Sequence, residues 1–130
     1  MASVLKLNTL TGASTAGSIA VTGEGNSTTT NLQQGLLKNW IHFDGTAGTP
    51  TAADSFNHSS ITDAGTGDYE NNITNAMANV NYMSICGSGQ FHSVDGGHNS
   101  TSKYSLELYN SSHSAADTGR CNMGLAGDLA

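Results

Sequence analysis

Residues 104–109, with the sequence Tyr-Ser-Leu-Glu-Leu-Tyr, indicate most clearly how this chain folds. Their apolar and polar side chains alternate, so Leu106 and Leu108 fall on the same side of an extended strand as Tyr104. The other side carries Ser105 and Glu107 and is polar. A strand of this kind buries one face and exposes the other, which is typical of an antiparallel sheet.

The same alternation recurs along the second half of the chain. Short strands are predicted at residues 55–62, 69–74, 80–86 and 120–125, with another at 90–94 inside a long polar loop, 87–103. Glycines in residues 63–68 predict a hairpin turn, and Tyr69, Asn71 and Ile73 share one face of the strand after it. Several short strands separated by Gly, Asn and Ser turns predict a mainly β domain over residues 41–130, an antiparallel β-sandwich or jelly-roll-like domain.

Residues 1–29 differ from this pattern and are predicted to form an extended attachment arm. They are rich in Gly, Ser, Thr and Ala, with two short apolar patches that predict strands at residues 4–7 and 18–21. The patches contain Val4, Leu5, Leu7, Ile19 and Val21. Since an isolated pair of strands is marginal in water, the arm is expected to become ordered only against a partner protein or a second copy.

Residues 30–40 carry the one helical signal and are predicted to form a short helix or linker. Thr30 and Gln33 fit a capping box, in which each side chain bonds a backbone N–H at the helix start. Leu32, Leu36 and Trp40 follow at spacings of four and would share one helix face. So short a helix does not persist alone in water, so this stripe is expected to pack under the following domain or against copies of the chain, and it is the candidate oligomer interface.

Composition limits how much core the chain can build. Ser, Thr, Asn and Gly make up 60 of the 130 residues, whereas Leu, Ile, Val and Phe together number 22. Few large side chains are left to offset the conformational entropy lost on folding. A rigid protein of this composition is expected to bury further surface against neighbouring chains.

The charges argue against several functional classes. The basic residues are Lys6, Lys38, Lys103 and Arg120, none adjacent to another, and the formal net charge is −6. Nucleic-acid binding needs clustered cations, so it is not expected. No apolar run approaches a membrane span, and no secretory signal pattern is seen. This predicts no membrane partner and a protein that is made in the cytosol and stays there or leaves by another route.

The best metal-like pattern is His92-x-x-Asp95-x-x-His98, with His113 and Asp117 further along. Imidazole and carboxylate groups suit zinc, but these residues lie in Gly- and Ser-rich segments that turn formation alone explains. We therefore expect no metal, no cofactor and no catalytic residue.

Two other patterns have plain structural explanations. Cys86 and Cys121 form neither a disulfide framework nor a zinc motif, and two reduced thiols are expected. The aromatic residues could line a sugar-binding surface, but in so poor a core they are more useful as buried volume. They are Trp40, Tyr69, Tyr82, Tyr104 and Tyr109.

Two stretches resemble known proteins. Residues 1–12 (MASVLKLNTLTG) and 28–38 look like the start of small virion proteins of tailed bacteriophages, marine and cyanobacterial ones above all. Residues 38–46, 54–69 and 75–82 are similar to a β-rich module of phage tail fibres. Residues 83–130 carry no such likeness, and the chain is much shorter than a long fibre and lacks shaft repeats.

This resemblance implies a non-enzymatic virion protein, a trimeric fibre-like appendage of the tail or head that bears the β module. Its expected partners are copies of itself, other tail or capsid proteins, and a glycan on the host surface. Two alternatives stay open: a capsid decoration (cement) protein that stabilises the head, and a small carbohydrate-binding module.

Overall fold

The computed structural model describes residues 4–12, 19–22, 28–32, 35–89, 93–97 and 100–130. The chain divides into two units, Met1–Gly35 and Leu36–Ala130. In the first unit, β1 (Ala20–Thr22) and β2 (Thr29–Asn31) form a two-stranded antiparallel sheet. Residues 4–7, where a strand was predicted, form none; that prediction is wrong.

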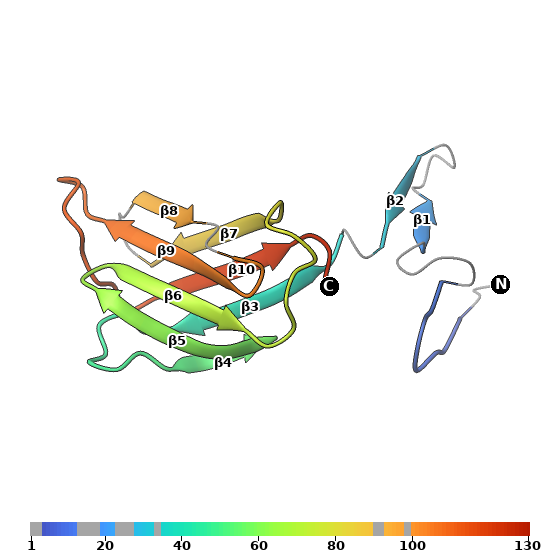
Figure 1. Cartoon of the computed structure of the whole chain (residues 1–130), viewed down its shortest axis with the longest axis horizontal. Coiled ribbons are helices and arrows are strands. Elements are labelled where there is room, and N and C mark those ends of the chain that lie inside the picture. Colours follow the sequence, from blue (N-terminus) through green and yellow to red (C-terminus); the bar gives the residue numbers. More distant parts are fainter. Residues whose placement is uncertain (1–3, 13–18, 23–27, 33–34, 90–92, 98–99) are drawn as a thin grey trace. The chain divides into compact units, whose positions relative to one another are not determined.

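The second unit contains eight strands in two four-stranded antiparallel sheets (Figure 1). One sheet has the order β4-β3-β10-β7 and the other the order β5-β6-β9-β8. The bounds are β3 Leu37–Phe43, β4 Ala52–Phe56, β5 His58–Gly65, β6 Asp68–Ile73, β7 Met83–Ser88, β8 Ser93–Gly97, β9 Lys103–Tyr109 and β10 Cys121–Ala126. The prediction of a mainly β, antiparallel domain is confirmed.

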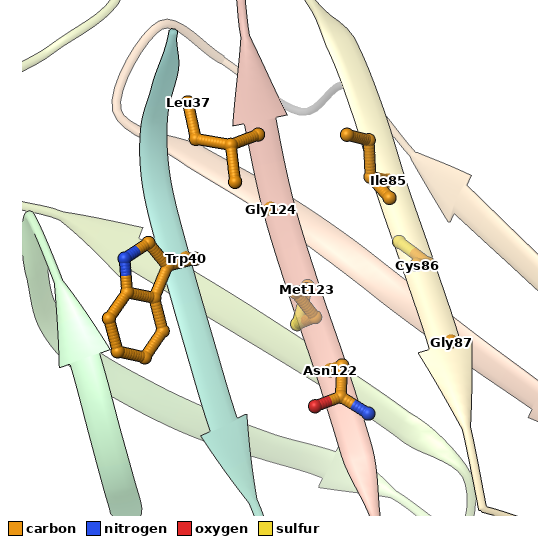
Figure 2. Close-up of a pocket in the computed structure, with 8 residues that line it drawn as sticks. All are labelled: Leu37, Trp40, Ile85, Cys86, Gly87, Asn122, Met123 and Gly124. Carbon is orange, nitrogen blue, oxygen red and sulfur yellow. The ribbon is translucent and has the colours of Figure 1, made fainter.

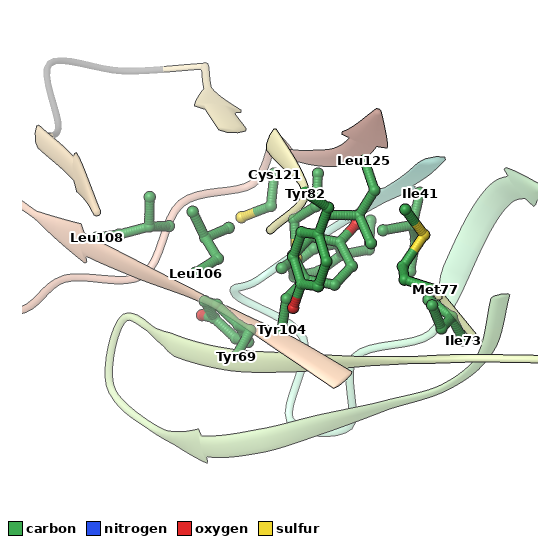
Figure 3. Close-up of a cluster of buried hydrophobic side chains, with 12 residues drawn as sticks. Ile41, Tyr69, Ile73, Met77, Tyr82, Tyr104, Leu106, Leu108, Cys121 and Leu125 are labelled. Carbon is green, nitrogen blue, oxygen red and sulfur yellow. The ribbon is translucent and has the colours of Figure 1, made fainter. Parts of the chain in front are cut away.

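Buried side chains of both sheets form one hydrophobic cluster (Figure 3). Strand β9 buries Tyr104, Leu106 and Leu108, the face that its alternating sequence predicts. Strands β3, β6 and β10 supply most of the rest, and burying each large apolar side chain contributes roughly 1.5–3 kcal/mol. The cluster consists of Ile41, Phe43, Tyr69, Ile73, Met77, Tyr82, Tyr104, Leu106, Leu108, Cys121, Met123 and Leu125.

A polar network lies within this apolar core. The Asn39 carbonyl accepts hydrogen bonds from Asn71 Nδ2 at 2.8 Å and from the Tyr104 hydroxyl at 2.5 Å, and all three side chains are fully buried. His58 Nδ1 lies 2.7 Å from Asn71 Oδ1 and donates to it, because that oxygen can only accept. The network joins β3 of one sheet to β6 and β9 of the other.

Asn57 marks a corner at which the chain leaves one sheet for the other. A single strand was predicted over residues 55–62, but it is divided here into the end of β4 and the start of β5. Asn57 has a φ of 54°, a left-handed conformation that asparagine tolerates better than most residues. Its side-chain amide donates to Lys38 O at 2.8 Å and Asn75 O at 3.0 Å, which holds the corner in place.

The predicted helix over residues 30–40 is wrong. β2 ends at Asn31 and β3 begins at Leu37, and the described residues between them are not helical. Pairing of β3 with both β4 and β10 satisfies its backbone groups and buries Ile41 and Phe43, which outweighs the weak local preference of a short helix.

Candidate functional site

An apolar surface lies on the outer face of the sheet β4-β3-β10-β7. Strand pairing places Phe56 opposite Trp40, Trp40 opposite Gly124, and Gly124 opposite Ile85. These four residues therefore form one row across all four strands. We call this row, together with Leu37 and Met83, the outer apolar face.

The outer apolar face is open to solvent. Phe56, Leu37, Met83 and Ile85 are each 47–58% exposed, whereas Trp40 is half-buried. Leu37 and Met83 both pair with Ala126, which makes a second, shorter row beside the first. Large apolar side chains scattered singly are ordinary on a protein surface, but a contiguous group across a whole sheet marks an interaction site.

Gly124 creates a shallow groove in the middle of this face (Figure 2). The groove has a volume of about 220 Å³, and Leu37, Trp40 and Ile85 project around it. A Cβ atom at Gly124 would lie no closer than 3.4 Å to its neighbours, so the backbone has room for a side chain there. The sequence leaves this position empty although a larger residue would fit.

A polar row borders the apolar one. Asp54, His42 and Asn122 are partners across β4, β3 and β10, two residues along each strand from Phe56, Trp40 and Gly124. His42 Nδ1 lies 2.9 Å from Asn122 Oδ1, which fixes the imidazole, and Asp54 is exposed. Asp54 thus places a carboxylate at this border of the outer apolar face.

The outer face of the sheet β5-β6-β9-β8 is acidic instead. Asp68 pairs with Glu107, and Glu70 forms a 2.8 Å ion pair with Lys103. Burial, followed by the nearby charges of Glu107, Glu70 and Asp63, raises the pKa of Asp68. Covering several carboxylates would remove their hydration, which is energetically costly. This face is therefore expected to stay in contact with water.

The most strongly shifted groups lie in the core. Burial raises the pKa of Tyr69, Tyr104 and Cys121, that of Cys121 to about 11, so each stays neutral near pH 7. The Tyr69 hydroxyl lies 2.7 Å from Asp117 Oδ1, which also accepts from Gly67 N–H at 2.7 Å. Asp117 was a metal candidate in the sequence pattern. In the structure it connects the β5–β6 turn to the segment before β10.

The other metal candidates are not brought together by what the structure describes. His92 and His98 lie outside the described residues, and of Asp95 only the backbone in β8 is described. His113 is exposed with a φ of 56°. Among the described residues no three His, Cys, Asp or Glu side chains are grouped to hold an ion. Cys86 and Cys121 carry thiols and not a disulfide, as expected.

The helix that was expected to align Leu32, Leu36 and Trp40 is not formed by the described residues, and Leu32 belongs to the first unit whereas Leu36 and Trp40 belong to the second. Leu32 follows β2 in the first unit, Leu36 precedes β3 with 52% exposure, and Trp40 lies on the outer face of β3. In the arm, Val4, Leu5, Leu7 and Val21 are exposed, and Ile19 is intermediate with its carbonyl accepting from Leu32 N–H at 2.8 Å.

Sequence reasoning selected Trp40 for its helical spacing and missed its actual neighbours. Phe56, Ile85 and Gly124 are distant from it in sequence and meet it only through strand order. Of the five aromatic residues expected in the core, Tyr69, Tyr82 and Tyr104 are buried, whereas Trp40 and Tyr109 are partly exposed. The one sequence signal for the outer apolar face was the alternation along β7, which puts Met83 and Ile85 on the same side of the strand.

Comparison of the chain with protein-family models, with curated proteins and with solved structures finds no match. In the part of the chain that the structure describes, no helix has the length and apolar character needed to cross a membrane.

Proposed function

We propose that this protein is a non-enzymatic structural subunit of a bacteriophage virion, a fibre-like appendage of the tail or head. In this proposal it assembles as a homotrimer through the outer apolar face. The observation that carries the proposal is the row Phe56, Trp40, Gly124 and Ile85, which spans a whole sheet and is open to solvent.

The contrast between the two sheets supports an assembly role. One outer face carries Asp68, Glu70 and Glu107, whereas the other carries large apolar side chains around a groove. Interfaces bury a central apolar patch inside a polar rim, and Asp54 and His42 supply part of such a rim here. A chain with so few large apolar residues gains much of its stability when that face is covered.

The arrangement of the strands supports a β-sandwich. Two antiparallel sheets contribute to one hydrophobic cluster, and we propose that they pack face to face as in sandwich domains. The jelly-roll form of the sandwich stays a prediction. In the observed strand orders, β3 lies beside β4 in one sheet and β5 lies beside β6 in the other.

The absence of a catalytic role is likewise part of the proposal. Its support is that the shifted groups already have structural partners in the core: Tyr69 with Asp117, and Tyr104 with Asn39. Groups fixed in this way lie away from the groove and are held neutral, which does not suit acid–base work near pH 7.

Glycan binding is a second candidate, favoured by one observation. Trp40 and Phe56 lie side by side with the polar row Asp54, His42 and Asn122 next to them. Aromatic faces beside hydrogen-bonding groups suit a sugar ring, but the surrounding Leu37, Met83 and Ile85 offer no polar partner.

The capsid decoration role uses the same assembly surface and differs only in copy number.

Native mass spectrometry and quantitative proteomics of purified phage particles test the proposal. We expect an oligomer at micromolar concentration, and peptides of this chain in intact particles. A few copies per particle indicate an appendage, and hundreds indicate capsid decoration. A monomer at all accessible concentrations, together with absence from particles, would overturn the proposal.

A further inference from the structure

We propose that the groove at Gly124 receives residues 4–10 of the arm of a second copy of this chain. The inference rests on the proposed function, because it names what covers the outer apolar face during assembly. Each copy would then donate one arm and accept another, so that three copies could close into a ring.

The arm carries exposed apolar side chains that can fill the apolar groove. Val4, Leu5, Leu7 and Leu10 are 54–81% exposed, and no strand pairing holds residues 4–10. Seven extended residues span roughly 23 Å, enough to cross four strands spaced roughly 4.8 Å apart. One or two leucine side chains fit a groove of about 220 Å³ between Trp40 and Ile85.

The charges are complementary. Lys6 is the one charged residue in residues 4–10, and it lies between Leu5 and Leu7. The paired rows of β4-β3-β10-β7 contain one carboxylate, the exposed Asp54, and the lysine of β3, Lys38, is buried. Because successive side chains of an extended segment point to opposite sides, Lys6 faces away from the groove when Leu5 and Leu7 enter it, and its attraction to Asp54 then acts through solvent.

A second copy accounts for two exposed apolar surfaces at once. Leu5 and Leu7 of the arm are exposed, and so are Phe56 and Ile85 of the outer apolar face. Residues 11–36 join residues 4–10 to the start of β3 at Leu37. Exchange of such segments between identical copies is a low-cost route to oligomers.

The test uses full-length chains altered on one side of the proposed contact. Gly124→Leu fills the groove, and an added Cβ there would make ordinary contacts, the nearest at 3.4 Å to Asn39 O. Ile85→Ser is a second groove variant at an exposed position. The double variant Leu5→Ser with Leu7→Ser removes the arm's apolar contacts. Thr62→Leu, on exposed β5 of the other sheet, is the matched control.

We expect each groove variant and the arm variant to weaken assembly by on the order of a hundredfold, as the loss of one or two buried leucines implies. Thr62→Leu should assemble like the natural chain. Mixing Gly124→Leu with the arm variant should restore a complex of two chains, since one partner still has an arm and the other still has a groove. Native mass spectrometry measures the oligomeric state of each variant and of the mixture, and circular dichroism checks that each variant is folded.

The other results overturn the inference in distinguishable ways. If the arm variant assembles normally while the groove variants do not, the outer apolar faces pack on each other, and the proposed function stands without this occupant. If the groove variants assemble normally and instead lose binding to host polysaccharide, the face is a glycan site. If the natural chain is monomeric throughout, this inference and the homotrimer of the proposed function both fail, and the search for the chain in phage particles then decides the virion role.

Discussion

The hydroxyl of Tyr104 in β9 donates a hydrogen bond of 2.5 Å to the side-chain carbonyl of Asn39 in β3, so that a polar pair joins the two sheets inside their common core. Asn39 Nδ2 in turn donates to Phe56 O at 3.0 Å and Asn57 O at 2.9 Å. One buried amide therefore connects the core to the corner at which β4 leads into β5 and to the backbone of Phe56 on the outer apolar face.

Removal of this amide should destabilise the domain strongly. Asn39→Ala removes the donor to two backbone carbonyls and the acceptor of the buried Tyr104 hydroxyl, which is expected to cost about 2–4 kcal/mol of unfolding free energy. Asn122→Ala, at an exposed position of β10, should cost less than about 1 kcal/mol. Urea unfolding followed by circular dichroism measures both; equal losses would contradict a special role for Asn39.

Gly67 should not tolerate a side chain. It has a φ of 69°, and a Cβ there would lie 2.6 Å from Leu108 O, which is part of the backbone. We expect Gly67→Ala to lower the free energy of unfolding by about 1–3 kcal/mol. Gly48→Ala meets nothing within 4 Å and should be neutral within about 0.5 kcal/mol. Similar thermal midpoints for the two variants would contradict this view of the turn.

Stability should fall in alkaline solution. Burial raises the pKa of Cys121 from 9.0 to about 11, so the folded state keeps a proton that the unfolded state releases. This contribution is complete below pH 9 and is lost as pH rises from 9 to 11, with a limiting slope of about 1.4 kcal/mol per pH unit. Tyr69 and Tyr104, whose pKa burial also raises, steepen the loss above pH 10.

Cys121→Ala separates the thiol from the two tyrosines. The variant should be less stable at pH 7, because it loses buried volume, but its free energy of unfolding should change less between about pH 9 and 10 than that of the natural chain. Urea titrations at a series of pH values provide the comparison. Identical pH dependence in the two proteins would show that the thiol is not held protonated by the fold.

The fluorescence of Trp40 should report assembly. It is the one tryptophan of the chain and lines the groove, where it is half-buried in a single copy. Covering the groove removes water from the indole, so the emission maximum should move to shorter wavelength as protein concentration rises. The variant with Leu5→Ser and Leu7→Ser should show no such shift. A concentration-independent spectrum in the natural chain would contradict burial of Trp40 on assembly.

Reversal of one charge should weaken assembly, and reversal of both should restore it. Lys6→Glu gives the arm a charge of the same sign as Asp54, and Asp54→Lys gives the face a charge of the same sign as Lys6. Each change is expected to weaken assembly about two- to tenfold, since exposed pairs contribute about 1 kcal/mol or less. The double variant should recover most of the loss, because the two charges are again opposite. Lowering the salt concentration should therefore weaken its assembly less than that of either single variant. Additive losses in the double variant would show that these residues do not interact.

The strands themselves could be predicted from local patterns. The alternation in residues 104–109 identified β9 and its buried face, and the period of two in residues 69–74 placed Tyr69, Asn71 and Ile73 inward in β6. The hairpin turn between β5 and β6 followed from its glycines. These features depend on neighbouring residues only, so a sequence pattern contains them.

The errors lie where distant segments compete with local preference. The spacing of Leu32, Leu36 and Trp40 favours a helix, but β4 and β10 hydrogen-bond to β3 and draw Leu37–Phe43 into the sheet. Likewise, residues 55–62 read as one strand because nothing local reveals that Asn57 bonds to Lys38 O and Asn75 O. A helix of one or two turns has too little intrinsic stability to resist such contacts.

By itself, then, the sequence determined a mainly β chain with polar turns, a modest apolar core and an arm of different composition. The tertiary structure decided which strands are neighbours, and with that the row Phe56, Trp40, Gly124 and Ile85. The reason is physical: side-chain alternation within a strand is set by its own backbone, whereas strand order is set by the burial of whole faces. A groove formed by a glycine between three distant side chains exists only after that order is fixed.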